Sequence, residues 1–312
     1  MLEEYGLKCI TLDLPFRLDH VNCFLAEGEH GWTVIDTGLH NEQTVKRWEE
    51  ELSGKDVTDI IVTHYHPDHF GYAGGLQLKH NARVHMTDID FQAATKAWDQ
   101  PFLDTLSQNY LLAGIPEDTA EAMLTNTKDF VPLVIPYPEV NQFLQDGDTI
   151  SIGKHHFEVI ATPGHSDGLV TFYNHDNNML LSTDHILPKI TPNISYWFHG
   201  EPDPLARYLE SLDKIKQRDA DFVVPSHGEP FFGANDRIEE IKSHHDKRLD
   251  QTLLAIGSGA SIYQISQQLF RKRLTVHEMR FAVGETLAHL EYLRNKGECH
   301  RELNGGTYWY YL

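Results

Sequence analysis

Three histidines and an aspartate fall within six residues of this chain, in the block His64-Tyr65-His66-Pro67-Asp68-His69. A β-like run at 59–63 precedes the block, and a glycine-rich turn at 71–75 follows it. Neutral imidazole nitrogens and carboxylate oxygens are ligands for borderline-soft divalent metal ions. A buried strand end is a costly place for polar groups without partners. The block therefore predicts a metal site at a strand end, rather than a surface loop that is merely rich in histidine.

Three other short β-like runs lead to the same kinds of residue. They end shortly before His165, Asp184 and His227. Each of these residues alone would more often be structural. Together with the first block, they supply seven candidate metal ligands: His64, His66, Asp68, His69, His165, Asp184 and His227. Seven groups are too many for one tetrahedral ion and suit two ions that share a bridging ligand.

With these motifs the sequence resembles the metallo-β-lactamase superfamily. The family's five motifs are matched by Asp36-Thr37-Gly38, the block at 64–69, His165, Asp184 and His227. The resemblance implies one ion bound by His64, His66 and His165, a second bound by Asp68, His69 and His227, and Asp184 as the bridge. Asp68 and Asp184 depart from true β-lactamases and make the set similar to the glyoxalase II and lactonase branches.

The predicted cofactors are two divalent metal ions, with zinc favoured and iron or manganese suited to the same His/Asp set. A hydroxide that bridges the ions is the expected nucleophile, because metal coordination lowers the pKa of water. Asp68 and Asp184 are the expected catalytic residues: Asp68 orients the hydroxide, and Asp184 keeps the ions at bridging distance. His185, Tyr196 and His199 follow the run that ends before Asp184. Tyr196 and His199 are candidates for orienting the substrate, but ordinary structural roles are favoured for all three.

The fold implied by the resemblance is α/β, an αββα sandwich with helices outside two sheets. We expect a catalytic domain at 1–235 and a small domain at 236–312. The small domain reads as three helices followed by a hairpin about Asn304-Gly305-Gly306, which resembles a winged helix. A structural or dimerising role is favoured for it over nucleic-acid binding, so a homodimer is one alternative left open.

The segment from about 90 to 141 interrupts the alternation of strands and helices. It carries an apolar stripe at helical spacing that includes Phe91, Trp98, Leu106 and Tyr110. This helical insertion could be a lid or substrate wall, a subunit interface, or a hairpin packed on the sandwich. Core packing is the default role of such a stripe, so the three alternatives stay open.

The charge of the chain is distributed unevenly. Residues 236–312 hold 11 basic and 10 acidic residues, whereas residues 1–235 hold 15 basic and 36 acidic residues. Long-range attraction of a polyanion to the catalytic half is therefore unfavourable. A small neutral or modestly charged molecule is the favoured substrate, and nucleic acid is a disfavoured partner that stays an alternative.

The sequence has no apolar run long enough to cross a bilayer, and its start lacks the pattern of a signal peptide. Its three cysteines, Cys9, Cys23 and Cys299, are widely spaced and suggest neither a disulfide framework nor a Cys-x-x-Cys zinc site. A cytoplasmic enzyme without a membrane partner is expected.

Three functional classes follow from these observations. The leading class is a binuclear metallohydrolase that acts on a small ester, thioester or lactone. The alternative is a metal-dependent endoribonuclease or phosphodiesterase of the same fold. The third is a metal-binding regulator whose C-terminal domain contacts DNA. The acidic catalytic half counts against both nucleic-acid classes.

Overall fold

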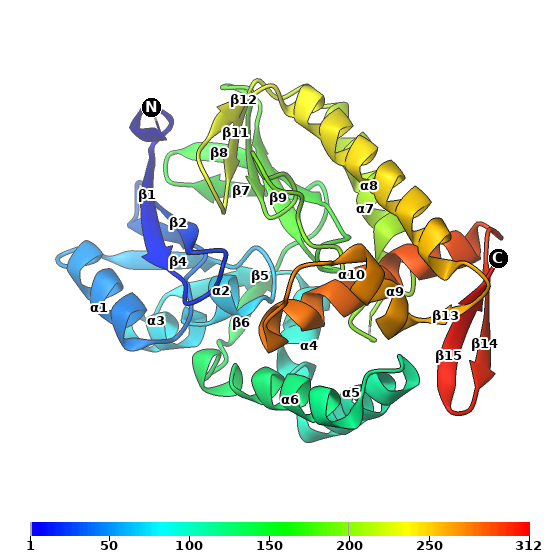
Figure 1. Cartoon of the computed structure of the whole chain (residues 1–312). Helices are drawn as coiled ribbons and strands as arrows, with labels where there is room; N and C mark the ends of the chain where they lie inside the picture. The colour runs from blue at the N-terminus through cyan, green and yellow to red at the C-terminus, as the bar shows by residue number, and fades with distance from the viewer. Residues whose placement is uncertain (1, 199) are drawn as a thin grey trace.

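Two six-stranded sheets form the centre of the molecule, which is described by a computed structural model over residues 2–198 and 200–312 (Figure 1). The first sheet runs in chain order through β1 (Leu7–Asp13), β2 (His20–Glu27), β3 (Trp32–Ile35), β4 (Val57–Ile61), β5 (Arg83–Met86) and β6 (Val140–Phe143). The second sheet has the order β12 (Phe231–Phe232), β11 (Phe222–Pro225), β10 (Met179–Thr183), β9 (Val170–Asn174), β8 (His155–Ala161) and β7 (Thr149–Ile152).

The two sheets pack face to face through an apolar core. Phe24, Ile35 and Ile61 of the first sheet are buried in one cluster with Phe172 and Leu181 of the second. Each sheet has both antiparallel and parallel pairs: β3 to β6 are parallel in the first sheet, and β10 and β11 are parallel in the second. Parallel neighbours bring the carboxyl ends of their strands to one edge, which is where the predicted metal ligands follow.

Helices cover the outer face of each sheet. The first sheet packs against α1 (Glu42–Glu51) and α3 (Ala73–His80), with Trp48 and Leu76 buried in that layer. The second packs against α7 (Pro204–Lys216) and α8 (Ala234–Ile256), with Leu212 and Ile241 buried there. The side chain of Asn41 caps the start of α1 by accepting from the Thr44 amide. These four layers confirm the predicted αββα sandwich.

Two local predictions near the metal block need correction. The strand expected at 59–63 is β4, Val57–Ile61, although the Val62 amide still donates a hydrogen bond to the carbonyl oxygen of His85 in β5. The glycine-rich segment at 71–75 is not a turn throughout, because α3 begins at Ala73 and contains two of its glycines. A Cβ at Gly74 would lie 1.9 Å from the Pro136 carbonyl oxygen, so glycine there permits close helix packing.

The helical insertion contains α4 (Asp88–Lys96), α5 (Gln100–Leu112), α6 (Glu117–Lys128) and the 3₁₀ turn η2 (Val131–Leu133). α4 packs on the first sheet, since Ala94 is buried in that layer. By contrast, α5 and α6 share a core with the C-terminal residues, in which Leu106 and Met123 lie with Leu287. In Figure 1 these two helices lie beneath α10. Of the three alternatives for the insertion, the hairpin packed on the sandwich is therefore wrong for α5 and α6.

The C-terminal residues form α8, β13 (Ala260–Ser261), α9 (Ile262–Leu269), α10 (Val276–Asn295), β14 (His300–Asn304) and β15 (Thr307–Tyr311). The three strands make a small sheet in the order β13-β15-β14. Ser261 and Thr275 start α9 and α10 with capping boxes. Three helices thus precede a hairpin, as expected, while the winged-helix likeness and the boundary between residues 235 and 236 stay predictions.

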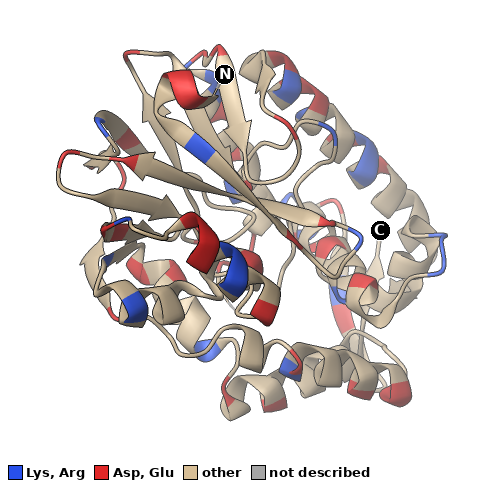
Figure 2. Cartoon of the chain, turned by 90° about the vertical axis from the view of Figure 1, so that its left-hand side faces the viewer, with Lys and Arg blue, Asp and Glu red and all other residues tan. Residues whose placement is uncertain are grey.

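Charged residues of both signs are mixed along the surface helices, as Figure 2 shows. None of the helices formed by residues 2–198 and 200–312 is both long and apolar enough to cross a lipid bilayer.

Candidate metal centre

The seven predicted ligands converge at one edge of the sandwich. His64 and His66 follow β4, and Asp68 and His69 lie in the short helix α2 (Pro67–Phe70). The other three come from the second sheet: His165 follows β8, Asp184 follows β10, and His227 follows β11. His66 and Asp68 are partly exposed, and the other five side chains are buried.

The first triad consists of His64, His66 and His165. The Nδ1 atom of His66 lies 3.1 Å from His64 Nε2 and 2.8 Å from His165 Nε2. Three ring nitrogens therefore face one point, as ligands of a single ion do. This is the set that the family resemblance implied for the first metal ion.

The second triad consists of Asp68, His69 and His227. Oδ2 of Asp68 lies 3.5 Å from His69 Nε2 and 3.5 Å from His227 Nε2. One carboxylate oxygen and two imidazole nitrogens thus surround a second point. The structure brings together the residues that the sequence assigned to the second metal.

Asp184 lies between the two triads. Its Oδ2 atom is 3.4 Å from Nε2 of His165 and 3.3 Å from Nε2 of His227, and its Oδ1 atom is 3.5 Å from Nε2 of His69. A single carboxylate therefore reaches residues of both triads, which is the geometry a bridging ligand needs.

Hydrogen bonds at the outer ring nitrogens orient three of the imidazoles. His69 Nδ1 lies 2.8 Å from Asp36 Oδ2, His165 Nδ1 lies 2.8 Å from the Asn193 carbonyl oxygen, and His227 Nδ1 lies 2.6 Å from the His20 carbonyl oxygen. A proton on each Nδ1 leaves Nε2 with its lone pair toward the centre.

Strained backbone positions support two of these residues. Asp36 adopts a left-handed conformation with φ 57°, and it accepts hydrogen bonds from the amide and hydroxyl of Thr63. Thr183 adopts φ 49° directly before Asp184, where the pairing with β11 shifts register. A β-branched residue in this region is costly and persists only where surrounding contacts enforce it. The strain at Thr183 therefore aims the Asp184 side chain at the triads.

The unpaired polar atoms at the centre fit divalent metal ions. Nε2 of His69, Nε2 of His227 and Oδ1 of Asp184 are buried and have no hydrogen-bond partner among the described residues. Leaving such atoms unpaired is unfavourable. Mixed imidazole and carboxylate donors of this kind are the ligands that zinc, iron and manganese take.

The two triads differ in their protonation without metal. Burial lowers the pKa of His64, His66 and His165, so these imidazoles are neutral and ready to act as ligands. Burial also opposes the charged form of His69, but Asp68, Asp184 and Asp36 outweigh it and raise its pKa well above the usual value. Asp184 and Asp68 likewise raise the pKa of His227.

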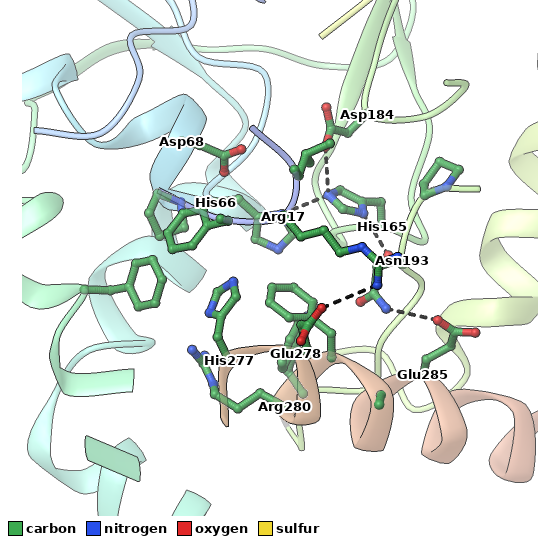
Figure 3. A pocket seen from close by; sticks show the side chains of 18 of the residues that line it. Arg17, His66, Asp68, His165, Asp184, Asn193, His277, Glu278, Arg280 and Glu285 are labelled. Atoms are coloured by element: carbon green, nitrogen blue, oxygen red, sulfur yellow. Dashed lines mark hydrogen bonds and ion pairs between the residues drawn. The ribbon is translucent and has the colours of Figure 1, made fainter. Parts of the chain in front are cut away.

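A cavity of about 400 Å³ opens in front of the triads. Its lining includes Asp68 and Asp184 at one side, aromatic residues of the insertion such as Phe130, and residues of α10 such as Phe281. Figure 3 shows the metal-ligand side chains facing His277 and Arg280 of α10 across this space. The insertion therefore lines this cavity together with the C-terminal helix, while its role as a substrate wall stays a prediction.

The sequence left open whether Tyr196, His185 and His199 lie at the site. Tyr196 packs in the cluster of α5, α6 and the C-terminal residues and does not line the cavity. His185 is buried against the ring of Tyr208, with 5.3 Å between ring centroids, and is not part of the cavity wall. His199 lies outside the described residues. The lining residues Arg17, Trp197, His277 and Arg280 were not anticipated, since none of them belongs to a motif of histidines and aspartates at a strand end.

Comparison with known families agrees with this centre. A family model described as the metallo-beta-lactamase superfamily matches residues 16–227, which include every residue of both triads. The chain belongs to this superfamily. A second model, described as a metallo-beta-lactamase-like C-terminal domain, matches residues 249–311.

Individual relatives of this superfamily chain span much of its length. A metallo-beta-lactamase family protein from Thermus thermophilus is 32% identical, with a TM-score of 0.86 over 98% of each chain. "Probable metallo-hydrolase YqjP" of Bacillus subtilis is 23% identical over 96% of each chain. "Hydroxyacylglutathione hydrolase GloC" of Haemophilus influenzae is 26% identical over 55% of this chain and 69% of its own length. The chain is thus a hydrolase of the metallo-beta-lactamase superfamily with a His/Asp metal-binding cluster.

Proposed function

We propose that this protein is a binuclear metal-dependent hydrolase that acts on a small ester, thioester or lactone. The observation that carries the proposal is Asp184, whose two oxygens lie within 3.5 Å of nitrogens from both triads. Two ions, with zinc favoured, would bind to His64, His66 and His165 and to Asp68, His69 and His227, with Asp184 between them.

Thioesters are the favoured substrates within this group. The relative from Haemophilus influenzae is named as a hydroxyacylglutathione hydrolase, and so is one from Pseudomonas fluorescens that is 26% identical over 57% of this chain. The cavity before the triads has the size of a small-molecule site and is lined largely by apolar side chains, including Phe130 and Phe281. Such walls suit an acyl chain better than a nucleic-acid backbone.

The metal ions would supply Lewis acidity, which lowers the pKa of water and polarises a carbonyl group. The protein's own residues would orient the reactants. Asp68, which is partly exposed toward the cavity, would accept a hydrogen bond from the attacking water at Oδ1, because its Oδ2 atom faces His69 and His227. Asp36 and Asn193 hold the rings of His69 and His165. The aromatic wall would exclude bulk water from the acyl chain.

A parallel activity screen tests the proposal. Protein purified without chelator is assayed by elemental analysis and then against thioesters, lactones, alkyl esters, phosphodiesters and single-stranded RNA. We expect about two divalent ions per chain and turnover of a thioester, ester or lactone that is lost in Asp68→Ala. A metal content well below one per chain contradicts the binuclear centre.

The nuclease alternative has its own outcome in the same screen. Metal-dependent RNA cleavage that is lost in Asp68→Ala, without turnover of any ester, thioester or lactone, would replace the proposed function by the phosphodiesterase alternative. The acidic composition of residues 1–235 argues against that outcome.

A further inference from the structure

Arg280 is a basic residue in the wall of the cavity that also holds Asp68 and Asp184. It lies in the second turn of α10 and is partly buried. Its side chain forms hydrogen bonds with Asn126 and Tyr110 and contacts aromatic rings, and no ion pair joins its guanidinium to a carboxylate in residues 2–198 or 200–312. A permanent positive charge therefore faces an apolar cavity without a neutralising partner.

Aromatic and amide contacts fix the position of this guanidinium. Its central carbon lies 5.7 Å from the ring centroid of Phe130 and 5.9 Å from that of Trp197, within the range of cation–π attraction. Nη1 of Arg280 donates to the side-chain oxygen of Asn126 over 3.2 Å. These contacts hold the side chain but leave its charge in place.

Neighbouring residues add donors that have no acceptor. Nε of Arg280, Nε1 of Trp98 and Nε1 of Trp197 are buried and have no hydrogen-bond partner among the described residues, and all three residues line the cavity. Trp98 is linked to Arg280 through Phe130, whose ring centroid is 6.2 Å from that of Trp98. We call Arg280, Trp98 and Trp197 the Arg280 cluster. Its members offer N–H donors and no acceptor, which is the complement of an anion.

The other titratable groups near the cluster do not neutralise it. His277 lies on the same face of α10, and burial together with Arg280 lowers its pKa to about 4, so it is neutral near pH 7. Glu278 pairs with Arg17 and takes part in the capping box of α10, and the carboxylate of Glu285 lies 3.5 Å from the guanidinium of Arg248. Asp68 and Asp184 belong to the metal centre at the other side of the cavity.

We infer that the Arg280 cluster binds a carboxylate at the far end of the substrate, separated by an apolar chain from the scissile carbonyl at the metal centre. The inference rests on the proposed function and narrows it to esters or thioesters that carry a carboxylate. Phe16, Phe130 and Phe281 line the cavity and would contact the intervening chain. The carboxylate can belong either to the acyl group or to the leaving thiol, because the same donors would bind it in both cases.

Equilibrium binding to the metal-loaded protein tests the inference without turnover. The acyl arm compares linear dicarboxylates from glutarate to sebacate with monocarboxylates of equal chain length. The thiol arm compares ω-mercaptocarboxylates with alkanethiols of equal length. A charge-assisted contact predicts that the compound with the distal carboxylate binds about 10- to 100-fold more tightly at the best chain length of one arm.

Variants of Arg280 decide whether the cluster causes that preference. In Arg280→Gln the preference should fall to within about threefold, and Arg280→Lys should retain a large part of it because the charge remains. Arg273→Gln, at an exposed position just before α10, is the matched control and should behave as wild type. Thermal unfolding shows whether each variant is folded. No preference in either arm, or the same preference in a folded Arg280→Gln, would overturn the inference.

The outcomes separate this inference from the proposed function. If wild-type protein turns over esters or thioesters without regard to a distal carboxylate, and neither binding arm shows a preference, the inference fails and the hydrolase proposal stands. If no ester or thioester is turned over but distal carboxylates bind in an Arg280-dependent way, the anion site stands and the proposed reaction fails.

Discussion

The two sides of the cavity are built in different ways. The metal side consists of seven residues that follow strand ends of the sandwich, and four of them lie within residues 64–69. The opposite side brings together Trp98 and Phe130 of the insertion, Trp197 of a loop, and Phe281 and Arg280 of α10. The first side is fixed by sheet topology, whereas the second depends on the packing of α5 and α6 against the C-terminal helices.

This difference indicates a division of roles. Strand ends hold the ligand atoms of each triad within 4.8 Å of one another, and outer hydrogen bonds fix three of the rings. The opposite wall is largely apolar, and it comes from segments outside the two sheets. We therefore expect changes on the metal side to affect the reaction itself and changes on the opposite side to affect the choice of substrate.

The largest effect is expected for Asp184→Ala. Loss of the residue shared by both triads should lower kcat/KM by at least about 1,000-fold, since metal ions contribute several kcal/mol to transition-state stabilisation. Asp104→Ala, at an exposed position in α5, is the control and should leave kcat/KM unchanged. The measurement is steady-state kinetics on the best substrate of the screen, with metal content determined in parallel. Near-normal kcat/KM at full metal content would show that Asp184 does not act at the reacting centre.

A smaller but still large effect is expected for Asp90→Ala. Asp90 is buried behind the metal side, where it accepts hydrogen bonds from the Tyr65 amide, the Ser166 hydroxyl and the Gly168 amide. It thereby ties the loop of His64 and His66 to the loop of His165. Removing the acceptor leaves three buried donors unpaired, so the free energy of unfolding should fall by about 3 kcal/mol.

Chemical denaturation of Asp90→Ala measures this fall, with Asp90→Asn as the closer variant because it keeps one acceptor oxygen. The pKa of Asp90 is raised to about 7 by burial, so the folded state binds a proton that the unfolded chain releases near pH 4. The contribution of that proton to the free energy of unfolding is therefore greatest below the pKa of the unfolded chain, and it is lost as pH rises through about 7. An unfolding free energy within about 1 kcal/mol of wild type in both variants would contradict a role in joining the two ligand loops.

The sequence predicts the metal side well because its signals are local. A strand end followed by a histidine or aspartate is visible in the chain at 64–69, 165, 184 and 227, and the structure brings all of these residues together. The opposite side could not be predicted in the same way. In the sequence, Arg280 is one of several charged residues in a helix with similar numbers of basic and acidic side chains. Only tertiary packing places it near Trp98, which is 182 positions earlier in the sequence.

Local signals also have limits on the metal side. The glycine-rich segment reads as a turn, but Gly74 is helical because α3 packs closely on the segment at Pro136. The strain at Thr183 leaves no sequence signal, since a threonine at a strand end is ordinary. The pairing of α5 and α6 with α10, rather than with a sheet, is likewise decided by which apolar faces meet after folding.

A moderate effect of pH should distinguish the two triads. His69 and His227 have raised pKa values without metal, so an ion that binds to them must displace a proton, whereas His64, His66 and His165 are already neutral. Affinity for the second ion should therefore rise with pH, by up to about tenfold per pH unit for each proton released. The first ion should bind with little dependence on pH over the same range.

Competition with a chelator of known affinity, carried out from about pH 6 to 8 where histidine titrates, measures both binding steps. His69→Gln, which removes one of the displaced protons, should reduce the pH dependence of ion binding at the second triad without changing that at the first triad. Equal pH dependence of the two steps would contradict the difference in protonation between the triads.

The smallest effect is expected for Arg17→Gln, at the border between the two sides. Arg17 lies in the loop after β1 and pairs with Glu278 of α10 at 3.5 Å, while its own side chain is 71% exposed. Exposed ion pairs contribute about 0–1 kcal/mol and are screened by salt. The variant should therefore unfold within about 1 kcal/mol of wild type in denaturant titrations at physiological salt. The matched variant Arg47→Gln, which removes the ion pair of a half-exposed arginine with Glu51, should do the same. Arg17 also lines the cavity, so KM should be measured as well. A rise in KM of about tenfold with unchanged stability would show that Arg17 acts with Arg280 in substrate selection. An unchanged KM would leave that selection to the Arg280 cluster.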